Sequence, residues 1–293
     1  MTSKGDLEAF ESHRAALLGL AYRMLGDLGR AQDVVQDAWL RWQERGVAVE
    51  SPKAFLVTIV TRLCLNELGS ARARREEARH DRLPEPVDLD EGGLARLEEL
   101  EQLSMAIMVV LERLKPAERA VLLLHEVFDF RHEDIARLVS RSPAVCRKLL
   151  ERARQRVSEG RRLITASRDE HQRLLDAFLR AASAGDAAAL GELLAADAVL
   201  ITNGGPEGRV FKGVRNLRRP LVGARQVAAF VTATSRRAEL EVERRELNGR
   251  PALVFHREGR PFAALLIAVA EGRIQQVFFQ ADPARLYHLA PAH

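Results

Sequence analysis

The period of the apolar residues changes once along this chain of 293 residues, and no other feature limits its fold as strongly. Up to about Ala166 apolar residues recur every three to four positions, which is the period of amphipathic helices. Two more short helical runs follow. From about Glu239, alternating segments are separated by turns such as Asn248-Gly249, which is typical of an antiparallel meander. We therefore predict a multidomain protein in which all-α domains precede an α+β domain.

Residues 7–79 are predicted to form the first helical domain. Its third helix begins at Ser51-Pro52, an N-cap and first-turn pair, and runs into the basic sequence "SARARREEA". Its second helix is amphipathic. The buried stripe of that helix is expected to be Ala31, Val35, Ala38, Trp39 and Trp42. The residues left outside are Asp33, Gln36, Asp37 and Arg41.

Residues 80–100 have the composition of a linker. The segment "HDRLPEPVDLDEGG" combines prolines, acids and a glycine pair, and from Asp81 to Glu101 there are eight acidic residues against two arginines. We expect this acidic, proline-containing stretch to separate two domains.

Residues 101–165 contain a helix-turn-helix pattern: a short helix, a turn of three to four residues, and a basic helix that Ser142-Pro143 begin. From Arg137 to Arg162 there are nine basic residues against two acidic ones. The apolar stripe of the basic helix is Cys146, Leu149, Leu150, Ala153 and Val157. A basic, exposed helix suits a polyanion such as DNA, although a merely solvated amphipathic helix has the same pattern.

Composition and spacing argue against several other classes. The longest apolar run, "FAALLIAVA", is too short to cross a bilayer, and the N-terminus lacks the pattern of a secretory signal, so we expect a cytoplasmic protein. The two cysteines, Cys64 and Cys146, lie far apart, without the spacing of a disulfide framework or a zinc site. No metal and no cofactor is expected.

Three segments carry a family resemblance. "LGLAYRMLGDLGRAQDVVQDAWLRW", "SPKAFLVTIVTRLCLNELGSARARREE" and "LERLKPAERAVLLLHEVFDFRHEDIARLVSRSPAVCRKLLERARQRV" resemble regions 2 and 4 of an extracytoplasmic-function sigma factor of the sigma-70 family. The remainder, residues 169–290, resembles a SnoaL-like domain of the nuclear transport factor 2-like superfamily. This resemblance implies a region 2 helical bundle, a region 4 helix-turn-helix and a conical sheet wrapped by helices.

The resemblance also implies the partners, which are core RNA polymerase and promoter DNA, and the residues that contact them. The exposed face of the second helix, Asp33, Gln36, Asp37 and Arg41, is expected to dock on the polymerase. The expected contacts with the −10 element are Asn66, Ser70, Arg72, Arg74 and Arg75. The expected contacts with the −35 element are Ser142, Ala144, Arg147, Lys148, Glu151, Arg152 and Arg154. Of these, Arg147 and Lys148 suit guanine edges or phosphates, and Arg152 and Arg154 suit the backbone.

Three short sequences resemble motifs by which such sigma factors join the C-terminal domain to the rest of the chain: "RLPEP" in the linker, "NGGPEGR" and "ADPARL". We expect interdomain contacts from Leu83, Pro84, Glu85 and Pro86, from Asn203, Gly204, Gly205 and Arg209, and from Asp282, Pro283, Arg285 and Leu286. The C-terminal domain is then expected to regulate the sigma factor. A small-molecule ligand of that domain is left open.

Two other functions remain as alternatives: a ligand-responsive helix-turn-helix regulator, and a SnoaL-type enzyme with a DNA-binding appendage. The enzyme hypothesis would nominate His256, Arg257 and Asp282, because some members of the superfamily use an Asp or His base. A lone histidine on a strand face is more often a satisfied interior or rim residue, so no enzymatic activity is expected. A repressor would not need the polymerase-docking helix.

Overall fold

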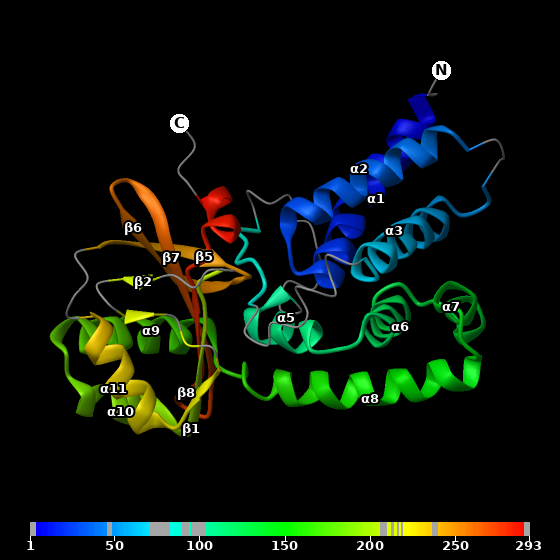
Figure 1. The fold of residues 1–293 in the computed structure, drawn as a ribbon. Helices are drawn as coiled ribbons and strands as arrows, with labels where there is room; N and C mark the ends of the chain where they lie inside the picture. Colours follow the sequence, from blue (N-terminus) through cyan, green and yellow to red (C-terminus); the bar gives the residue numbers. More distant parts are fainter. Residues whose placement is uncertain are drawn as a thin grey trace. The chain divides into compact units, whose positions relative to one another are not determined.

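The computed structural model describes residues 4–45, 49–70, 83–89, 94, 103–205, 210–211, 214–215, 217, 219–235 and 240–289 (Figure 1). The chain forms two compact units. The N-terminal unit comprises Met1–Ala78, Asp90–Leu100 and Met108–Ser158, and the C-terminal unit comprises Arg79–Leu89, Glu101–Ile107 and Glu159–His293. The linker segment Leu83–Leu89 is therefore part of the C-terminal unit.

The N-terminal unit begins with helices α1 (Lys4–Leu25), α2 (Leu28–Gln43) and α3 (Pro52–Leu68), which pack against one another. Local capping begins two of them. The Asp27 carboxylate accepts a hydrogen bond from the Arg30 N–H at 3.0 Å, and Ser51 Oγ accepts one from the Ala54 N–H at 3.3 Å. The stripe predicted for α2 is buried, with Trp39 only half-buried.

The prediction that the third helix continues into the basic segment is wrong at Gly69. Helix α3 ends at Leu68, and Gly69 caps it through its N–H, which donates to the Leu65 carbonyl at 2.9 Å. The Ser70 N–H then closes a turn onto the Glu67 carbonyl. Glycine has a high conformational cost in a helix interior, which favours termination here. Residues 71–78 lie outside the described part of the chain.

The second helical group consists of α5 (Met105–Glu112), α6 (Pro116–Glu126), α7 (His132–Val139) and α8 (Pro143–Arg161). Ser140, with a φ of 53°, ends α7 in the left-handed conformation, and three residues connect α7 to α8. Helices α6 and α7 contact α3, and all three belong to the N-terminal unit, whereas the first residues of α5 belong to the C-terminal unit. The predicted helix-turn-helix is confirmed.

The C-terminal unit is an α+β domain, as predicted. Its six-stranded sheet has the order β4-β1-β8-β7-β6-β5, and β2 and β3 form a separate two-stranded sheet. The strands are β1 (Leu194–Asn203), β2 (Val210–Phe211), β3 (Val214–Arg215), β4 (Leu221–Val222), β5 (Glu241–Leu247), β6 (Arg250–Arg257), β7 (Arg260–Ala270) and β8 (Arg273–Gln280). Strands β5 to β8 form the predicted antiparallel meander, with the Asn248-Gly249 turn between β5 and β6.

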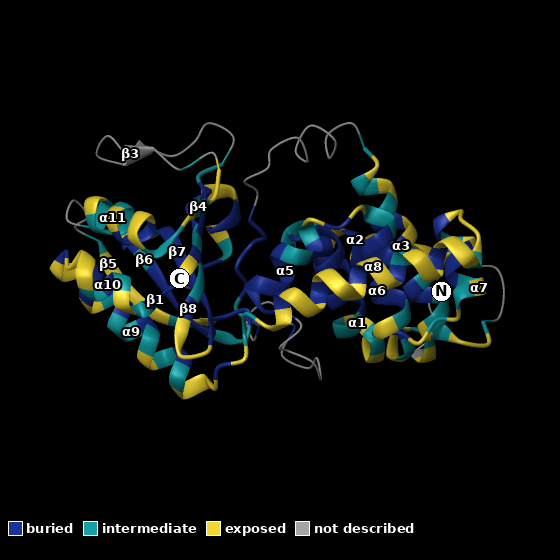
Figure 2. Cartoon of the chain, turned by 90° about the horizontal axis from the view of Figure 1, so that it is seen from below, coloured by how far each residue is buried: buried dark blue, intermediate teal, exposed yellow. Residues whose placement is uncertain are grey.

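Several elements of this domain were not predicted, among them β1 and α11. Strand β1 pairs in parallel with β8, and helix α11 (Ala224–Ser235) packs beside α10 (Ala187–Leu193) and β1. Together with α9 (Arg168–Ala184), these helices lie along the sheet (Figure 1). Apolar side chains from the helices and the sheet share one core, in which Leu175, Phe178 and Val277 are almost fully buried. Figure 2 shows the buried stretches of these elements in dark blue. Two short 3-10 turns, η2 (Pro283–Arg285) and η3 (Tyr287–Leu289), follow the last strand.

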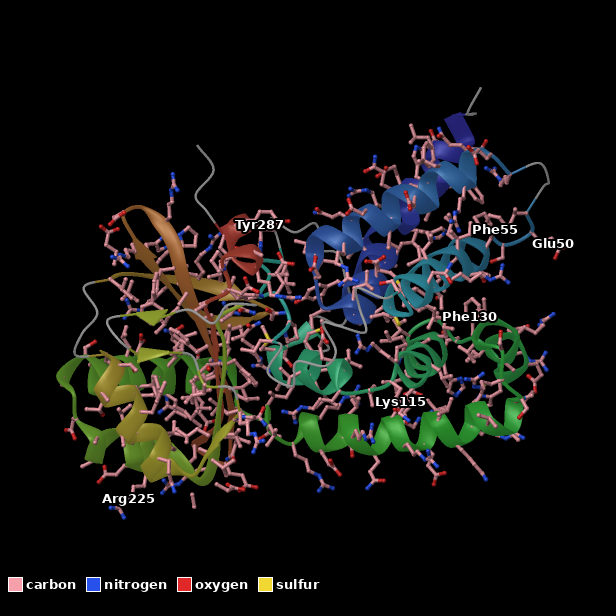
Figure 3. The ribbon with its side chains drawn as sticks, in the orientation of Figure 1. Glu50, Phe55, Lys115, Phe130, Arg225 and Tyr287 are labelled. Atoms are coloured by element: carbon pink, nitrogen blue, oxygen red, sulfur yellow. The ribbon has the colours of Figure 1, made fainter. Side chains whose placement is uncertain are left out.

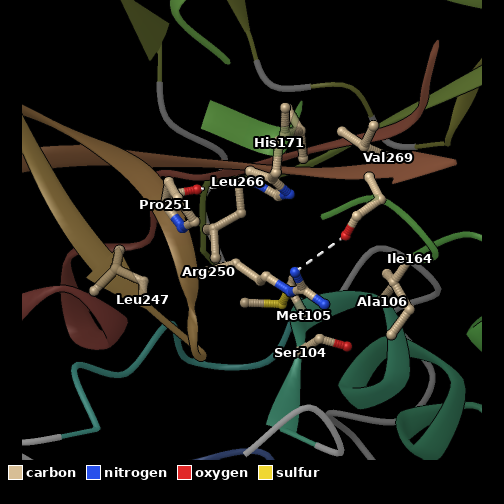
Figure 4. Close-up of a pocket in the computed structure, with 12 residues that line it drawn as sticks. Ser104, Met105, Ala106, Ile164, His171, Leu247, Arg250, Pro251, Leu266 and Val269 are labelled. Carbon is tan, nitrogen blue, oxygen red and sulfur yellow. Dashed lines mark hydrogen bonds between the residues drawn. The ribbon is translucent and has the colours of Figure 1, made fainter. Parts of the chain in front are cut away.

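His171 of α9 is buried in this unit and hydrogen-bonded (Figure 4). Its Nε2–H donates to the Pro251 carbonyl at 3.0 Å. Burial lowers the pKa of His171 to about 4, and the nearby Arg250 and Arg168 act in the same direction. The native state therefore holds this imidazole neutral, whereas the unfolded chain binds a proton below its ordinary pKa of 6.5.

Acid is therefore expected to destabilise the C-terminal unit through His171. Because the pKa is lowered on folding, the stabilisation is complete above about pH 6.5 and is lost as the pH falls towards 4, by about 3 kcal/mol at most. His171→Gln keeps a hydrogen-bond donor at this position but does not titrate. Between pH 7 and 5, the hydrogen-exchange protection of β6 and β7 should therefore fall less in this variant than in the unsubstituted chain. His13→Gln, in the N-terminal unit, is the control. Equal losses of protection in His171→Gln and the unsubstituted chain would contradict the assignment.

Candidate nucleic-acid interface

Helix α8 presents a basic face to solvent. Its start is capped, because Ser142 Oγ accepts a hydrogen bond from the Val145 N–H at 3.3 Å. Its buried stripe is Cys146, Leu150, Ala153 and Val157. The exposed side is Ala144, Arg147, Lys148, Glu151, Arg152 and Arg154, which is the predicted −35 set together with the capping Ser142. Figure 3 shows side chains extending from α8 away from α6.

The cations of α8 differ in how they are held. Arg154 forms an ion pair with Glu126 of α6, with Nη2 2.5 Å from the carboxylate, and Arg156 reaches Glu118 at 3.4 Å. Within the described ranges no ion-pair partner is found for Arg147, Lys148 or Arg152. Two unpaired cations at the start of the helix therefore have their donors available for bases or phosphates. Arg154 would have to leave Glu126 to act in the same way.

Two histidines beneath this interface were missed by the sequence reasoning. The rings of His125 and His132 stack with centroids 4.7 Å apart, and His125 Nδ1 donates to the Phe130 carbonyl at 3.1 Å. Burial lowers the pKa of His132, and the neighbouring His125 and Arg147 lower it further. A neutral His132 adds no positive charge beside Arg147. Only the packing of α6 against α7 brings the two rings together.

The residues predicted for polymerase docking share one exposed surface on α2. Asp33, Gln36, Asp37 and Arg41 are all exposed, at the spacing of successive helical turns. Leu40 lies on the same surface and is 49% exposed, which the predicted set did not include. Leu40 therefore adds an apolar group to this otherwise polar surface.

The predicted −10 set is only partly described. Asn66 is exposed on the last turn of α3, and Ser70 is half-buried just beyond that helix. Arg30 of α2 holds the same end of α3 through an ion pair with Glu67 at 2.7 Å. Arg72, Arg74 and Arg75 lie outside the described residues.

The linker residues Leu83, Pro84, Glu85 and Pro86 are buried in the C-terminal unit, where two residues that were not predicted contact them. The amide of Gln280 donates to the carbonyls of Leu83 and Pro84 at 3.2 and 3.3 Å. The ring of His288 lies 2.6 Å from the Pro86 carbonyl and 2.6 Å from a Glu85 carboxylate oxygen.

The other two predicted interdomain segments meet each other. A Cβ on Gly205, whose φ is 80°, would lie 2.9 Å from the Asp282 carboxylate, so only glycine fits there. Asp282 caps η2 by accepting from the Ala284 N–H, and the Ala281 N–H donates to the Asn203 carbonyl at 2.6 Å. Gly204 follows Asn203 and Pro283 begins η2, whereas Arg285 and Leu286 are buried. Arg209 lies outside the described residues.

The residues of the enzyme hypothesis have structural partners. His256 Nε2 lies 2.8 Å from the Glu243 carboxylate, Asp282 caps η2, and Arg257 is exposed. Among the residues that the structure describes, no cluster of three or more His, Cys, Asp or Glu side chains is arranged to hold a metal ion. Cys64 and Cys146 are both free and buried. In the same described ranges, no helix has the length and apolar character needed to span a bilayer.

Comparison with known proteins gives consistent matches over nearly the whole chain. Family models for Sigma-70 region 2 and for Sigma-70, region 4 match residues 9–74 and 104–157. The probable ECF RNA polymerase sigma factor SigI of Mycobacterium tuberculosis is 30% identical over 286 residues, which cover 95% of this chain and 93% of that protein. The ECF RNA polymerase sigma factor SigJ of the same organism is 36% identical over 230 residues, covering 77% and 72%. The crystal structure of M. tuberculosis SigJ matches with a TM-score of 0.73 and 26% identity, over 98% of this chain and 100% of that one.

Two helical sigma-70 regions, one of them with an open basic helix, define a transcription initiation factor that binds core RNA polymerase and promoter DNA. This chain belongs to the extracytoplasmic-function sigma factors. Its α+β C-terminal unit lies within the part of the chain that SigI and the SigJ structure match.

Proposed function

We propose that this sigma factor reads the −35 element through the first turns of α8 and docks on core polymerase through the exposed face of α2. Ser142, Ala144, Arg147, Lys148 and Glu151 line the start of the recognition helix. Arg147 and Lys148 contact base edges or phosphates, while Arg152 and Arg154 position the helix on the backbone. The absence of ion pairs to Arg147 and Lys148 within the described chain leaves their donors available for this role.

The −10 element is assigned to the end of α3 and the segment after it. Asn66 and Ser70 offer polar groups to a splayed base, and Arg72, Arg74 and Arg75 supply positive charge for the backbone. The exposure of Asn66 supports this proposal.

We also propose that the C-terminal domain modulates the sigma factor without catalysing a reaction. The observation that carries this proposal is the burial of Leu83–Leu89 in the C-terminal unit, with backbone carbonyls bound by Gln280 and His288. A linker held in this way couples the domain to the segment that joins regions 2 and 4. The pairing of His256 with Glu243 supports a structural role for this candidate base. The protein acts in the cytoplasm, where it meets the polymerase.

Reversing both carboxylates, as Asp33→Lys with Asp37→Lys, is expected to abolish co-purification with core polymerase, because two attractive contacts become repulsive. The fold should persist, since both side chains are exposed and surface substitutions away from special features seldom change stability by more than about 0.5 kcal/mol. Leu40→Ser should weaken the association less.

The matched control is Glu192→Lys with Glu271→Lys, which changes the net charge equally at exposed positions of the C-terminal unit. Retained co-purification of the α2 variant would contradict the docking surface.

Run-off transcription with a chain ending at Ser167 tests whether the C-terminal domain modulates the sigma factor. Output equal to that of the full chain would argue against this role.

A further inference from the structure

One residue of the C-terminal domain binds the chain on both sides of the acidic linker segment, at Val87 within the linker and at Leu103 just after it. Asn248 is 1% exposed and lies in the β5–β6 turn, where its φ is 52° and that of Gly249 is 71°. Its backbone N–H donates to the Val87 carbonyl at 2.7 Å, and its Oδ1 accepts from the Val87 N–H at 3.1 Å. Its Nδ2 donates to the Leu103 carbonyl at 2.8 Å. Val87 and Leu103 are themselves fully buried.

These contacts close the linker into a loop. Val87 and Leu103 are 16 positions apart in the sequence, and that length of extended chain spans about 55 Å. While both residues are bonded to the same amide, the backbone atoms that it contacts are no more than about 9 Å apart. While Asn248 holds both ends, this stretch therefore contributes about 9 Å instead of about 55 Å to the reach between the region 2 and region 4 segments.

The two ends of the loop are not equally secured. The Val87 end has additional anchors, because Gln280 binds the carbonyls of Leu83 and Pro84 and His288 binds that of Pro86. At the Leu103 end, Asn248 Nδ2 supplies a side-chain hydrogen bond, and Leu103 is also held by its burial. Losing one amide donor therefore weakens the attachment of the linker on the side that leads into region 4.

We propose that Asn248 determines the spacing of promoter elements that this sigma factor accepts. Each base pair added between the −10 and −35 elements moves region 4 by about 3.4 Å along the DNA and rotates it by about 35°. A linker that is closed by Asn248 has little spare length to follow these changes. A released linker has enough length to follow them. The inference rests on the proposed coupling of the C-terminal domain to the linker.

Two substitutions separate the contacts without straining the turn. Asn248→Gly removes both side-chain bonds and keeps the positive φ, because Gly-Gly suits a two-residue hairpin turn. Asn248→Asp keeps the acceptor for the Val87 N–H but replaces the donor to Leu103 by a second acceptor. Glu271→Gly is the matched control, since Glu271-Gly272 is the turn between β7 and β8 with nearly the same φ angles, 53° and 71°.

The experiment measures run-off transcription by the full-length holoenzyme on a promoter recovered with the unsubstituted protein, with its spacer varied by up to three base pairs in each direction. Both Asn248 variants should match the unsubstituted protein at the best spacer and exceed it by about fivefold at spacers two base pairs away. Glu271→Gly should keep the original profile. Hydrogen exchange at the Val87 amide should rise in Asn248→Gly and stay low in Asn248→Asp.

Identical spacer profiles for all four proteins would overturn the proposal. So would a fall of equal proportion at every spacer, which would indicate only a loss of folded protein. Absence of transcription by the unsubstituted holoenzyme at every spacer would instead contradict the assigned function, so the two failures are distinguishable.

Discussion

Replacing Arg147 or Lys148 by alanine is expected to lower affinity for the −35 element by about 1 to 3 kcal/mol each, if each contact is bidentate to a base. Both side chains lie on the exposed face at the start of α8. Since neither has an ion-pair partner in the described part of the chain, their removal should leave the fold unchanged. The double variant should lose nearly all upstream recognition while still binding core polymerase.

The measurement is promoter binding and run-off transcription at two or more salt concentrations. A lost phosphate contact weakens binding to all sequences and reduces the salt dependence, whereas a lost base contact changes which promoters are selected. Arg137→Ala on α7 is the control, because this arginine is exposed but paired with Asp134. Unchanged promoter selection by both single variants would refute the role given to the start of α8.

Replacing Arg119 by leucine is expected to destabilise the N-terminal unit by about 3 to 5 kcal/mol. Arg119 of α6 is 2% exposed, and its guanidinium donates to the carbonyls of Met24, Glu112 and Leu114. It therefore ties the end of α1 to the segment between α5 and α6. Leucine fills part of the space but leaves these buried acceptors without their donors, which is the costly outcome.

Urea unfolding followed by tryptophan fluorescence measures this loss. Both tryptophans of the chain, Trp39 and Trp42, belong to α2 and therefore report on the N-terminal unit. Arg62→Leu, at an exposed position of α3, is the control and should change the free energy of unfolding by less than about 0.5 kcal/mol. A loss below about 1 kcal/mol in Arg119→Leu would show that the three carbonyls find other donors.

Several functional features could be read from the sequence because they depend on neighbouring residues. Ser142-Pro143 begins α8 through a contact three residues away, and the apolar period of α2 assigns Asp33 and Asp37 to its outer face. The Asn248-Gly249 pair specifies a hairpin turn for the same reason. Such features are local in the chain, and a single segment carries all the information needed to predict them.

The contacts between distant segments were decided by the tertiary structure alone. Gln280, His288 and Asn248 reach linker residues between 145 and 202 positions away, and each would look like an ordinary strand, turn or C-terminal residue in isolation. The parallel pairing of β1 with β8 is equally non-local. Hydrophobic period and capping determined which elements form and which faces they expose. The partners of a buried amide or imidazole depend on which backbone groups the packed chain leaves unsatisfied beside it, and only the folded structure specifies those groups.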